Sequence, residues 1–252
     1  MNNTEKFTGK AENYSKFRPV YPNEYIDYLK SYANLCEKSI VADIGSGTGI
    51  LTKQLSMECN TVYAVEPNLD MINKAKFDLK DFNNIIFFDT TAENTGIPEN
   101  SVDLVTVGQA YHWFDKIKFF DECKRFLKSN GYVSLVWNNR DIKSDCINEN
   151  FKILKKYCPD FKGFSSGTDF SLLDTELNDF FDSCFEIKEF KNTCKIEREG
   201  FIGRCLSSSY VPNDNKDLIY ELNEIFDRFS KNNMLDYPYI TRSYTGKLMK
   251  ED

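Results

Sequence analysis

A glycine-rich turn at the end of an apolar segment constrains this chain more than any other feature. Residues 40–49 read Ile-Val-Ala-Asp-Ile-Gly-Ser-Gly-Thr-Gly, and apolar residues follow at helical spacing, at Ile50, Leu51 and Leu55. The first five residues are typical of a buried strand, and the glycines allow a sharp turn that comes close to a ligand. A helix after the turn offers unpaired N–H groups at its start. The stretch therefore predicts a strand, turn and helix that bind a small molecule.

Short apolar segments alternate with helical patterns along the chain. Such alternation is typical of a parallel sheet with helices on both faces, which binds ligands beyond the carboxyl ends of its strands. The sequence predicts a seven-stranded, mostly parallel, Rossmann-like α/β sheet with a helical lid or insertion. The expected strands are 40–44, 61–65, 85–88, 102–107, 132–137, 185–190 and 239–244. The expected helices include 48–57, 148–157, 198–209 and 217–229, and one with a face at 119–127 that ends at a cap signal, Asn130-Gly131.

The glycine spacing narrows the ligand. A dinucleotide-binding turn has its third glycine one position later than Gly49, and no lysine is placed for a phosphate-binding loop. Asp43, just before the turn, would repel a pyrophosphate and suit a cationic group. Glu66 lies about 20 residues after Gly45, where an acidic residue accepts hydrogen bonds from a ribose. These residues predict a ligand with a ribose, a positive charge and no phosphate.

Three motifs resemble those of class I S-adenosylmethionine-dependent methyltransferases. Residues 41–49 resemble the first motif, and Glu66-Pro67-Asn68 followed by Met71 resembles the second. Thr91-Ala92-Glu93 resembles the third, where the Ala-Glu pair borders the adenine in this family. Segments 14–22 and 109–114 are similar to those of small-molecule methyltransferases like trans-aconitate methyltransferase, with a type 11-like domain. The resemblance, clear over residues 7–137, implies S-adenosyl-L-methionine as cofactor and a small-molecule acceptor whose reactive group, a carboxylate, oxygen or nitrogen, stays open.

The resemblance also implies roles for individual residues. Arg18 is a candidate partner for the methionyl carboxylate or for an acidic substrate. His112, the single histidine, is a candidate general base, although its aromatic neighbours favour a packed wall. The predicted cofactor-binding residues are Tyr14, Arg18, Asp43, Gly45, Ser46, Gly47, Thr48, Gly49, Glu66, Pro67, Met71, Ala92, Glu93 and Gln109. The predicted substrate-binding residues are Tyr21, His112 and Trp113.

One domain over residues 1–252 is expected, because no repeat, low-complexity tract or clear linker interrupts the chain. We expect a lid and helix over 1–35, a cofactor-binding core over 36–140, and a C-terminal part with a helical insertion and the last strands over 141–252. The prolines in segment 14–22 make a poor helix but an ordered lid.

Charge and composition restrict the partners. The net charge of −7 gives no general attraction to nucleic acid or to anionic membranes. The N-terminus lacks a signal core, no stretch is long and apolar enough to span a membrane, and the scattered cysteines predict no metal site. We expect a cytoplasmic protein, monomeric or a weak homodimer. Two alternatives stay open: a non-catalytic S-adenosylmethionine-binding regulatory protein, and a nicotinamide-dependent oxidoreductase.

Overall fold

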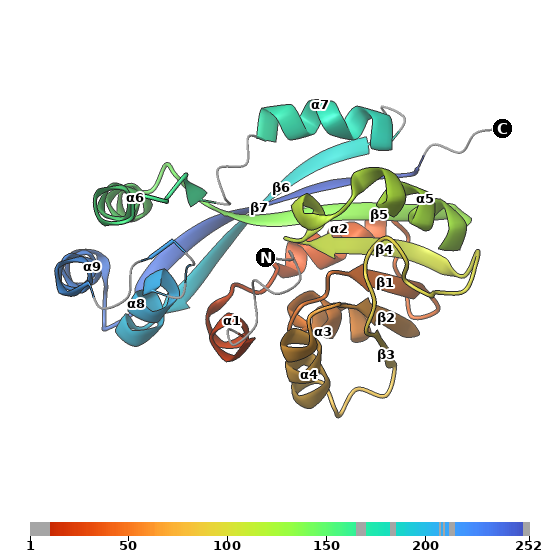
Figure 1. The fold of residues 1–252 in the computed structure, drawn as a ribbon, viewed down its shortest axis with the longest axis horizontal. Coiled ribbons are helices and arrows are strands. Elements are labelled where there is room, and N and C mark those ends of the chain that lie inside the picture. The colour runs from red at the N-terminus through yellow and green to blue at the C-terminus, as the bar shows by residue number, and fades with distance from the viewer. Residues whose placement is uncertain are drawn as a thin grey trace.

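One seven-stranded sheet organises the molecule, which a computed structural model describes over residues 11–164, 170–181, 185–206, 208, 210–211 and 215–248 (Figure 1). The strand order is β3-β2-β1-β4-β5-β7-β6. Neighbours from β3 to β5 pair in parallel, and β7 runs antiparallel to both β5 and β6. The strands are β1 (Ile40–Ile44), β2 (Thr61–Val65), β3 (Ile85–Phe88), β4 (Val102–Gly108), β5 (Leu127–Arg140), β6 (Phe185–Ile196) and β7 (Leu235–Gly246). The predicted α/β fold is confirmed.

Helices cover both faces of the sheet and bury two apolar layers. On one face, α2 (Asn23–Tyr32) and α3 (Ile50–Ser56) pack on the central strands through residues such as Leu29 and Leu55. On the other face, α5 (Lys116–Phe126) and α7 (Phe170–Phe180) contribute Phe119, Phe126 and Leu177. Burial of such large side chains is the main stabilising term for a layered fold.

A second helical group extends the molecule beyond the parallel strands. The last three strands are 12 to 14 residues long, whereas β1 to β3 have four or five. On the extension pack α6 (Asp145–Tyr157), α8 (Arg198–Leu206) and α9 (Lys216–Phe229), with an apolar cluster of their own (Figure 1). We call this group the helical arm. It supplies the predicted helical insertion.

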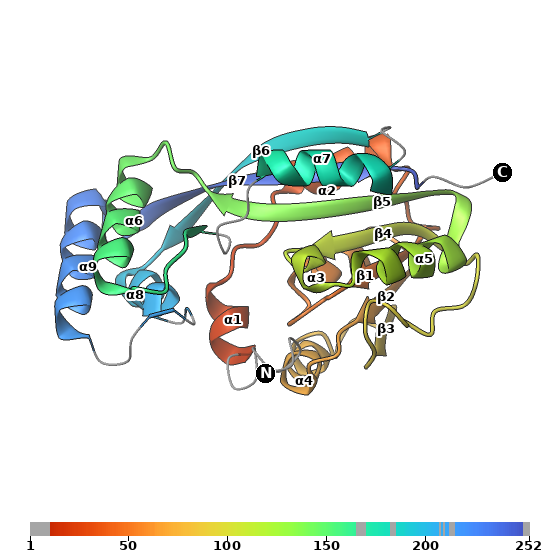
Figure 2. The same cartoon turned by 45° about the horizontal axis from the view of Figure 1, so that its top comes forward.

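The N-terminal helix α1 (Ala11–Phe17) lies between the helical arm and α4 (Leu69–Asp78), as Figure 2 shows. The Ser15 hydroxyl donates to Asp78 of α4 at 3.0 Å, and Lys16 lies 3.6 Å from Glu199 of α8. Segment 18–22 then runs from α1 to α2. The prediction that this region is a poor helix was wrong for residues 14–17, because the first proline comes only at position 19, after the helix has ended.

Two other local expectations differ from the structure. Helix α5 ends at Phe126 rather than near Asn130-Gly131, and the chain enters β5 at Leu127. The pairing of β5 with β4 shifts register between Val102 and Leu104, so residues 128–131 form an irregular stretch of β5. Asn130-Gly131 therefore lies in this irregular stretch of β5 and does not end a helix. Helix α7 was not expected at all.

Candidate cofactor and acceptor site

The glycine turn between β1 and α3 stands at the carboxyl edge of the sheet. The Gly45 and Ser46 amides donate to the carbonyl of Val65 at 2.9 and 3.0 Å, which fixes the start of the turn on β2. Gly45 and Gly47 have φ of +70° and +58°, in the left-handed region that favours glycine. Both therefore shape a backbone that other residues adopt only with strain.

Two of the site's glycines also allow elements to approach closely. A Cβ at Gly45 would lie 2.5 Å from the Ala110 Cβ, and one at Gly108 would lie 2.5 Å from the Tyr21 hydroxyl oxygen. Both separations are shorter than real Cβ contacts, so a larger residue at either position would force its neighbour to shift. The glycine turn, the end of β4 and segment 18–22 are thus brought together at one edge.

Two adjoining cavities open along this edge. The larger encloses about 790 Å³, part of it continuous with solvent, a size typical of sites for small organic ligands. It is lined by Gly45, Gly47, Glu66, Pro67, Met71, Thr91, Ala92, Glu93, Gly108, Gln109, Ala110, Trp113 and Phe114. The smaller is lined by Arg18, Pro19, Tyr21, Asp43, Gly45, Ser46, Gly47, Thr48, Ile50, Leu51, Gly108, Gln109 and Asn138. Four shared residues (Gly45, Gly47, Gly108 and Gln109) join the two into a single elongated cleft.

Glu66 follows β2 and faces the larger cavity. Its carboxylate accepts the Gly47 amide on Oε2 and the Asn68 amide on Oε1, both at 2.9 Å. Burial raises the pKa of Glu66, and these amides lower it in part. The two bonds leave further lone pairs on each oxygen, so the carboxylate is oriented and still able to accept from a ligand hydroxyl.

Asp43, near the end of β1, connects the turn to two neighbouring elements. Its side chain accepts the Thr52 hydroxyl at 2.6 Å and the Thr106 hydroxyl at 3.0 Å, which ties β1 to α3 and β4. Burial raises the pKa of Asp43 to about 6, and the two hydroxyls oppose the rise. Asp43 also borders the smaller cavity. Cofactor binding by Asp43 stays a prediction, and anchoring is the role that its contacts support.

Two hydroxyl groups of the glycine turn are placed to bind a polar group of a ligand. Ser46 Oγ and Thr48 Oγ1 are buried and have no hydrogen-bond partner within the described residues, and both residues line the smaller cavity. Buried polar groups are nearly always hydrogen-bonded in native proteins, so these two fit a polar ligand group. Gly49 lines neither cavity. Its φ of +81° begins α3, and a Cβ there would lie 2.6 Å from Leu79.

Segment 18–22 forms one wall of the smaller cavity. The Tyr21 amide donates to Gln54 Oε1 at 3.0 Å, and Gln54 Nε2 donates back to the Tyr21 carbonyl at 2.8 Å. Arg18 lines this cavity, and its pairing with a carboxylate stays a prediction. Only the backbone of Tyr14, in α1, is described, so its predicted side-chain contact lies outside the described part of the structure.

The predicted residues after β4 separate into two groups. Gln109, with φ of +61°, and Trp113 line the larger cavity. His112 is exposed on the 3-10 turn η2 (Tyr111–Trp113), its ring 4.6 Å from that of Trp113, and it lines neither cavity. A catalytic role for His112 stays a prediction that its place does not favour.

Several residues of the site escaped the sequence interpretation. Asn138 lines the smaller cavity, and its carbonyl accepts Gln109 Nε2 at 3.1 Å. Its position directly after the predicted strand 132–137 is the signal that could have found it. Thr52 and Thr106, the partners of Asp43, come from α3 and from mid-β4 and carry no comparable signal.

Comparison with known proteins agrees with this geometry. The family model described as a methyltransferase domain matches residues 42–135, which include the glycine turn, Glu66 and the residues after β4. Residues 42–135 of the chain are therefore similar to a methyltransferase domain. S-adenosylmethionine is the cofactor that this domain implies, and the oriented Glu66 carboxylate and the two orphaned hydroxyls fit such a ligand.

The matched relatives align with part of the chain. An uncharacterized methyltransferase of Mycobacterium tuberculosis is 36% identical over 141 residues, 56% of this chain and 55% of that protein. A methyltransferase-like protein of Schizosaccharomyces pombe is 32% identical over 161 residues, 64% of this chain and 62% of that protein. The chain spans about half the length of the curated relatives it matches first.

Solved structures share the methyltransferase fold over nearly the whole chain. A protein of Anaeromyxobacter dehalogenans, assigned as a type II methyltransferase, superposes with a TM-score of 0.71 at 19% identity, over 93% of this chain and all of that one. The YcgJ protein of Bacillus subtilis does so with a TM-score of 0.57 at 20% identity, over 92% and 100%. Among the residues that the structure describes, no helix is long and apolar enough to cross a bilayer.

Proposed function

We propose that the protein is an S-adenosylmethionine-dependent methyltransferase whose acceptor is a small molecule with an acidic group. The observation that carries the acceptor class is a concentration of arginine side chains between the cleft and the helical arm. The cofactor assignment follows from the matched domain, and Glu66, Ser46 and Thr48 are the residues that we expect to hold its ribose and methionyl groups.

Three arginines lie close enough for their charges to interact, and one of them lines the smaller cavity. Arg18 lines that cavity, and Asn138, also in its lining, is followed two residues later on the same face of β5 by Arg140. The Arg140 guanidinium donates to the Tyr237 hydroxyl at 2.9 Å and lies 4.2 Å over the Phe164 ring. Arg204, from α8 in the arm, lies 4.8 Å over the Tyr239 ring and 5.5 Å over the Tyr237 ring.

This cluster carries positive charge in an apolar, aromatic setting. Arg204 is 5% exposed, and within the described residues no carboxylate forms an ion pair with Arg140. Burial lowers the pKa of Arg204, and the charges of Arg140 and Arg18 lower it further. The half-buried charge of Arg140 would be compensated by a carboxylate or similar anion on the acceptor.

Access to the cleft favours a small acceptor. Helix α1 stands between α4 and α8 and is held to both by polar contacts. Segment 18–22, which lines the smaller cavity, thus follows a helix that joins α4 to the arm. The net negative charge of the chain gives no support to a nucleic-acid substrate.

For methyl transfer, the protein would mainly have to position the acceptor and exclude water. When bound, S-adenosylmethionine supplies a methyl group already activated by a sulfonium. Trp113, Phe114 and Tyr21 would exclude water, and the arginines would hold the acceptor so that its nucleophile faces the methyl group in line. A carboxylate nucleophile needs no general base, in keeping with the exposed position of His112.

Binding and turnover test the two parts of the proposal separately. Calorimetric titration with S-adenosylhomocysteine should show binding, and Glu66→Gln should weaken it about tenfold or more, because a hydrogen bond to a charged acceptor is lost. No binding by the wild type would refute the cofactor assignment.

Turnover is followed as S-adenosylhomocysteine release with small mono-, di- and tricarboxylic acids, with their amides as neutral counterparts. Arg140→Gln should abolish most activity on acids while S-adenosylhomocysteine binding persists. Arg228→Gln is the matched control, because Arg228 pairs with Glu149 on the exposed side of the same arm. Activity on amides alone, or equal loss in both variants, would contradict the acidic acceptor. Binding without any turnover would favour the regulatory alternative.

A further inference from the structure

The connection between β3 and β4 brings its residues to the larger cavity without the support of a sheet. Thr91, Ala92 and Glu93 line that cavity, and they belong to a segment, residues 89–101, that has no helix or strand. Ala92 is 5% exposed, whereas Thr91, Asn94 and Gly96 around it are exposed. Something outside the segment must hold these three residues in place if they are to contact a cofactor.

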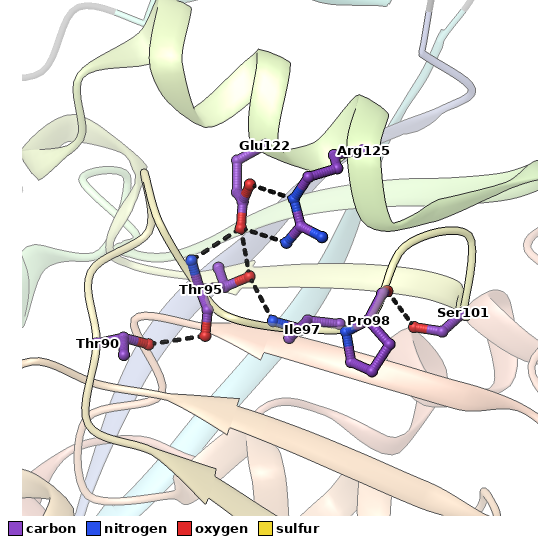
Figure 3. Close-up of polar contacts among 7 residues, drawn as sticks. All are labelled: Thr90, Thr95, Ile97, Pro98, Ser101, Glu122 and Arg125. Carbon is purple, nitrogen blue, oxygen red and sulfur yellow. Dashed lines mark hydrogen bonds and ion pairs between the residues drawn. The ribbon is translucent and has the colours of Figure 1, made fainter.

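Two contacts from outside hold the segment. The Asp115 amide donates to the Glu93 carboxylate at 2.9 Å, and Glu122 of α5 binds Thr95 (Figure 3). Glu122 Oε1 accepts the Thr95 amide at 2.8 Å and the Thr95 hydroxyl at 2.6 Å. Thr95 itself is completely buried, and its carbonyl accepts the Thr90 hydroxyl at 3.0 Å. Thr95 thus ties α5 on one side and Thr90 on the other, which closes the segment into a loop around residues 91–93.

A second charge fixes the orientation of the Glu122 carboxylate. Arg125, one helical turn further along α5, donates from Nε to Oε2 at 2.8 Å and from Nη2 to Oε1 at 2.7 Å. The Arg125 guanidinium lowers the pKa of Glu122 to about 2, and the Thr95 bonds act in the same direction. Such bidentate, charge-assisted contacts have a defined direction and are among the strongest hydrogen bonds in proteins. We call this arrangement the Glu122 anchor.

We propose that Glu122 is a positioning residue that holds residues 91–93 against the nucleobase of the cofactor and so sets the preference for adenine. The inference rests on the proposed use of S-adenosylmethionine. Recognition of a base edge by short polar and backbone groups requires that they stay in place, because an unmatched donor or acceptor discriminates between ligands only when it cannot move away. Glu122 itself does not line the cavity, so it acts through Thr95.

The test compares two ligands in calorimetric titrations of the full chain. One is S-adenosylhomocysteine, and the other is its inosine counterpart, which carries an oxygen in place of the amino group of adenine. The variant is Glu122→Gln, which keeps the shape of the side chain and removes its charge. We expect the wild type to prefer adenine, and Glu122→Gln to lose about tenfold in adenine affinity and most of the preference.

Asp103→Asn is the matched control. Asp103 accepts the Ile40 amide at 2.8 Å, and the Lys128 ammonium donates to its two carboxylate oxygens at 2.8 and 2.9 Å. Like Glu122, it therefore binds one backbone amide and one cation, but it lies at the opposite edge of the sheet. It should lose stability without any change in the ligand preference. Thr95→Val, which removes one donor to Glu122, should lose part of the preference and serves if Glu122→Gln does not fold.

The outcomes separate this inference from the proposed function. A wild type that binds neither ligand refutes the proposed cofactor. If the wild type prefers adenine and Glu122→Gln keeps the same preference, the anchor alone is overturned. If Glu122→Gln does not fold, the same preference in Thr95→Val overturns it. Loss of preference in Asp103→Asn as well would also overturn it, because a general loss of stability would then explain the effect.

Discussion

Two glycines of the turn, Gly45 and Gly47, should respond differently to the same substitution. Gly45 and Gly47 both have positive φ, at +70° and +58°, so an alanine at either is strained. A left-handed conformation costs a residue with a Cβ about 1–2 kcal/mol. Gly47→Ala meets nothing within 4 Å of the new Cβ, so this strain is its whole expected effect on stability.

Gly45→Ala adds a steric cost. Its Cβ would lie 2.5 Å from the Ala110 Cβ and 3.2 Å from the ring of Phe114. Ala110 has no side-chain torsion that could move its Cβ away, so the backbone after β4 must shift. Overpacking of this kind costs about 1–3 kcal/mol, which brings the expected total for Gly45→Ala to about 2–5 kcal/mol.

The assay is urea unfolding of both variants beside the wild type, with the free energy of unfolding compared at a common slope. Gly45→Ala should be less stable than Gly47→Ala by about 1–3 kcal/mol. Equal destabilisation of the two variants would refute the reasoning, because it would mean that the contact with Ala110 is relieved without cost and that backbone strain alone governs the turn.

Three further substitutions test other parts of the site. Burial raises the pKa of Asp43 from 3.8 to about 6, so the folded protein binds this proton more tightly than the unfolded chain. The free energy of unfolding should therefore fall by roughly 3 kcal/mol as pH rises from about 4 to about 6, and Asp43→Asn should flatten that part of the curve measured by urea unfolding; an unchanged slope would contradict the assignment. Asn68 caps α4 by accepting the Met71 amide at 3.1 Å, so Asn68→Ala should cost about 1 kcal/mol in thermal or urea unfolding and also weaken S-adenosylhomocysteine binding, whereas Asn215→Ala, which removes the cap of α9, should affect stability only. His112→Gln should leave the affinity for S-adenosylhomocysteine unchanged in calorimetry, because the side chain is exposed. A large loss of affinity would show that His112 takes part in cofactor binding.

The short-range features of the fold could be predicted from local patterns. Strands β1 to β4 follow runs of apolar residues that parallel strands bury on both faces, and Asn68 caps its helix through a bond three residues along the chain. Helix α7 was missed because apolar residues such as Leu173, Leu177 and Phe181 do not by themselves distinguish a short helix from a buried strand. Only packing against β5 and α5 decides between them.

The candidate site divides in the same way. Gly45, Gly47 and Glu66 could be recognised from spacing along one chain segment, because a turn and the end of the neighbouring strand meet in any parallel sheet of this kind. Asp43 was correctly placed at the turn, but its bonds to Thr52 and Thr106 join three elements, and no local pattern predicts such partners. Asn138 reaches the cleft only because β5 continues past the neighbouring strands.

By itself, the sequence determined the class of fold and the edge of the sheet where a nucleoside-like cofactor would bind, because both depend on periodicity and on the conformations that glycine permits. The tertiary structure alone decided what surrounds that edge. The Glu122 anchor joins residues 27 positions apart, and the charges of Arg18 and Arg140 act on Arg204, which lies far from both along the chain. Such contacts depend on how the helices pack and how far the strands extend. Local patterns do not predict them, because burial of apolar surface brings together residues that are close in space, whatever their separation along the chain.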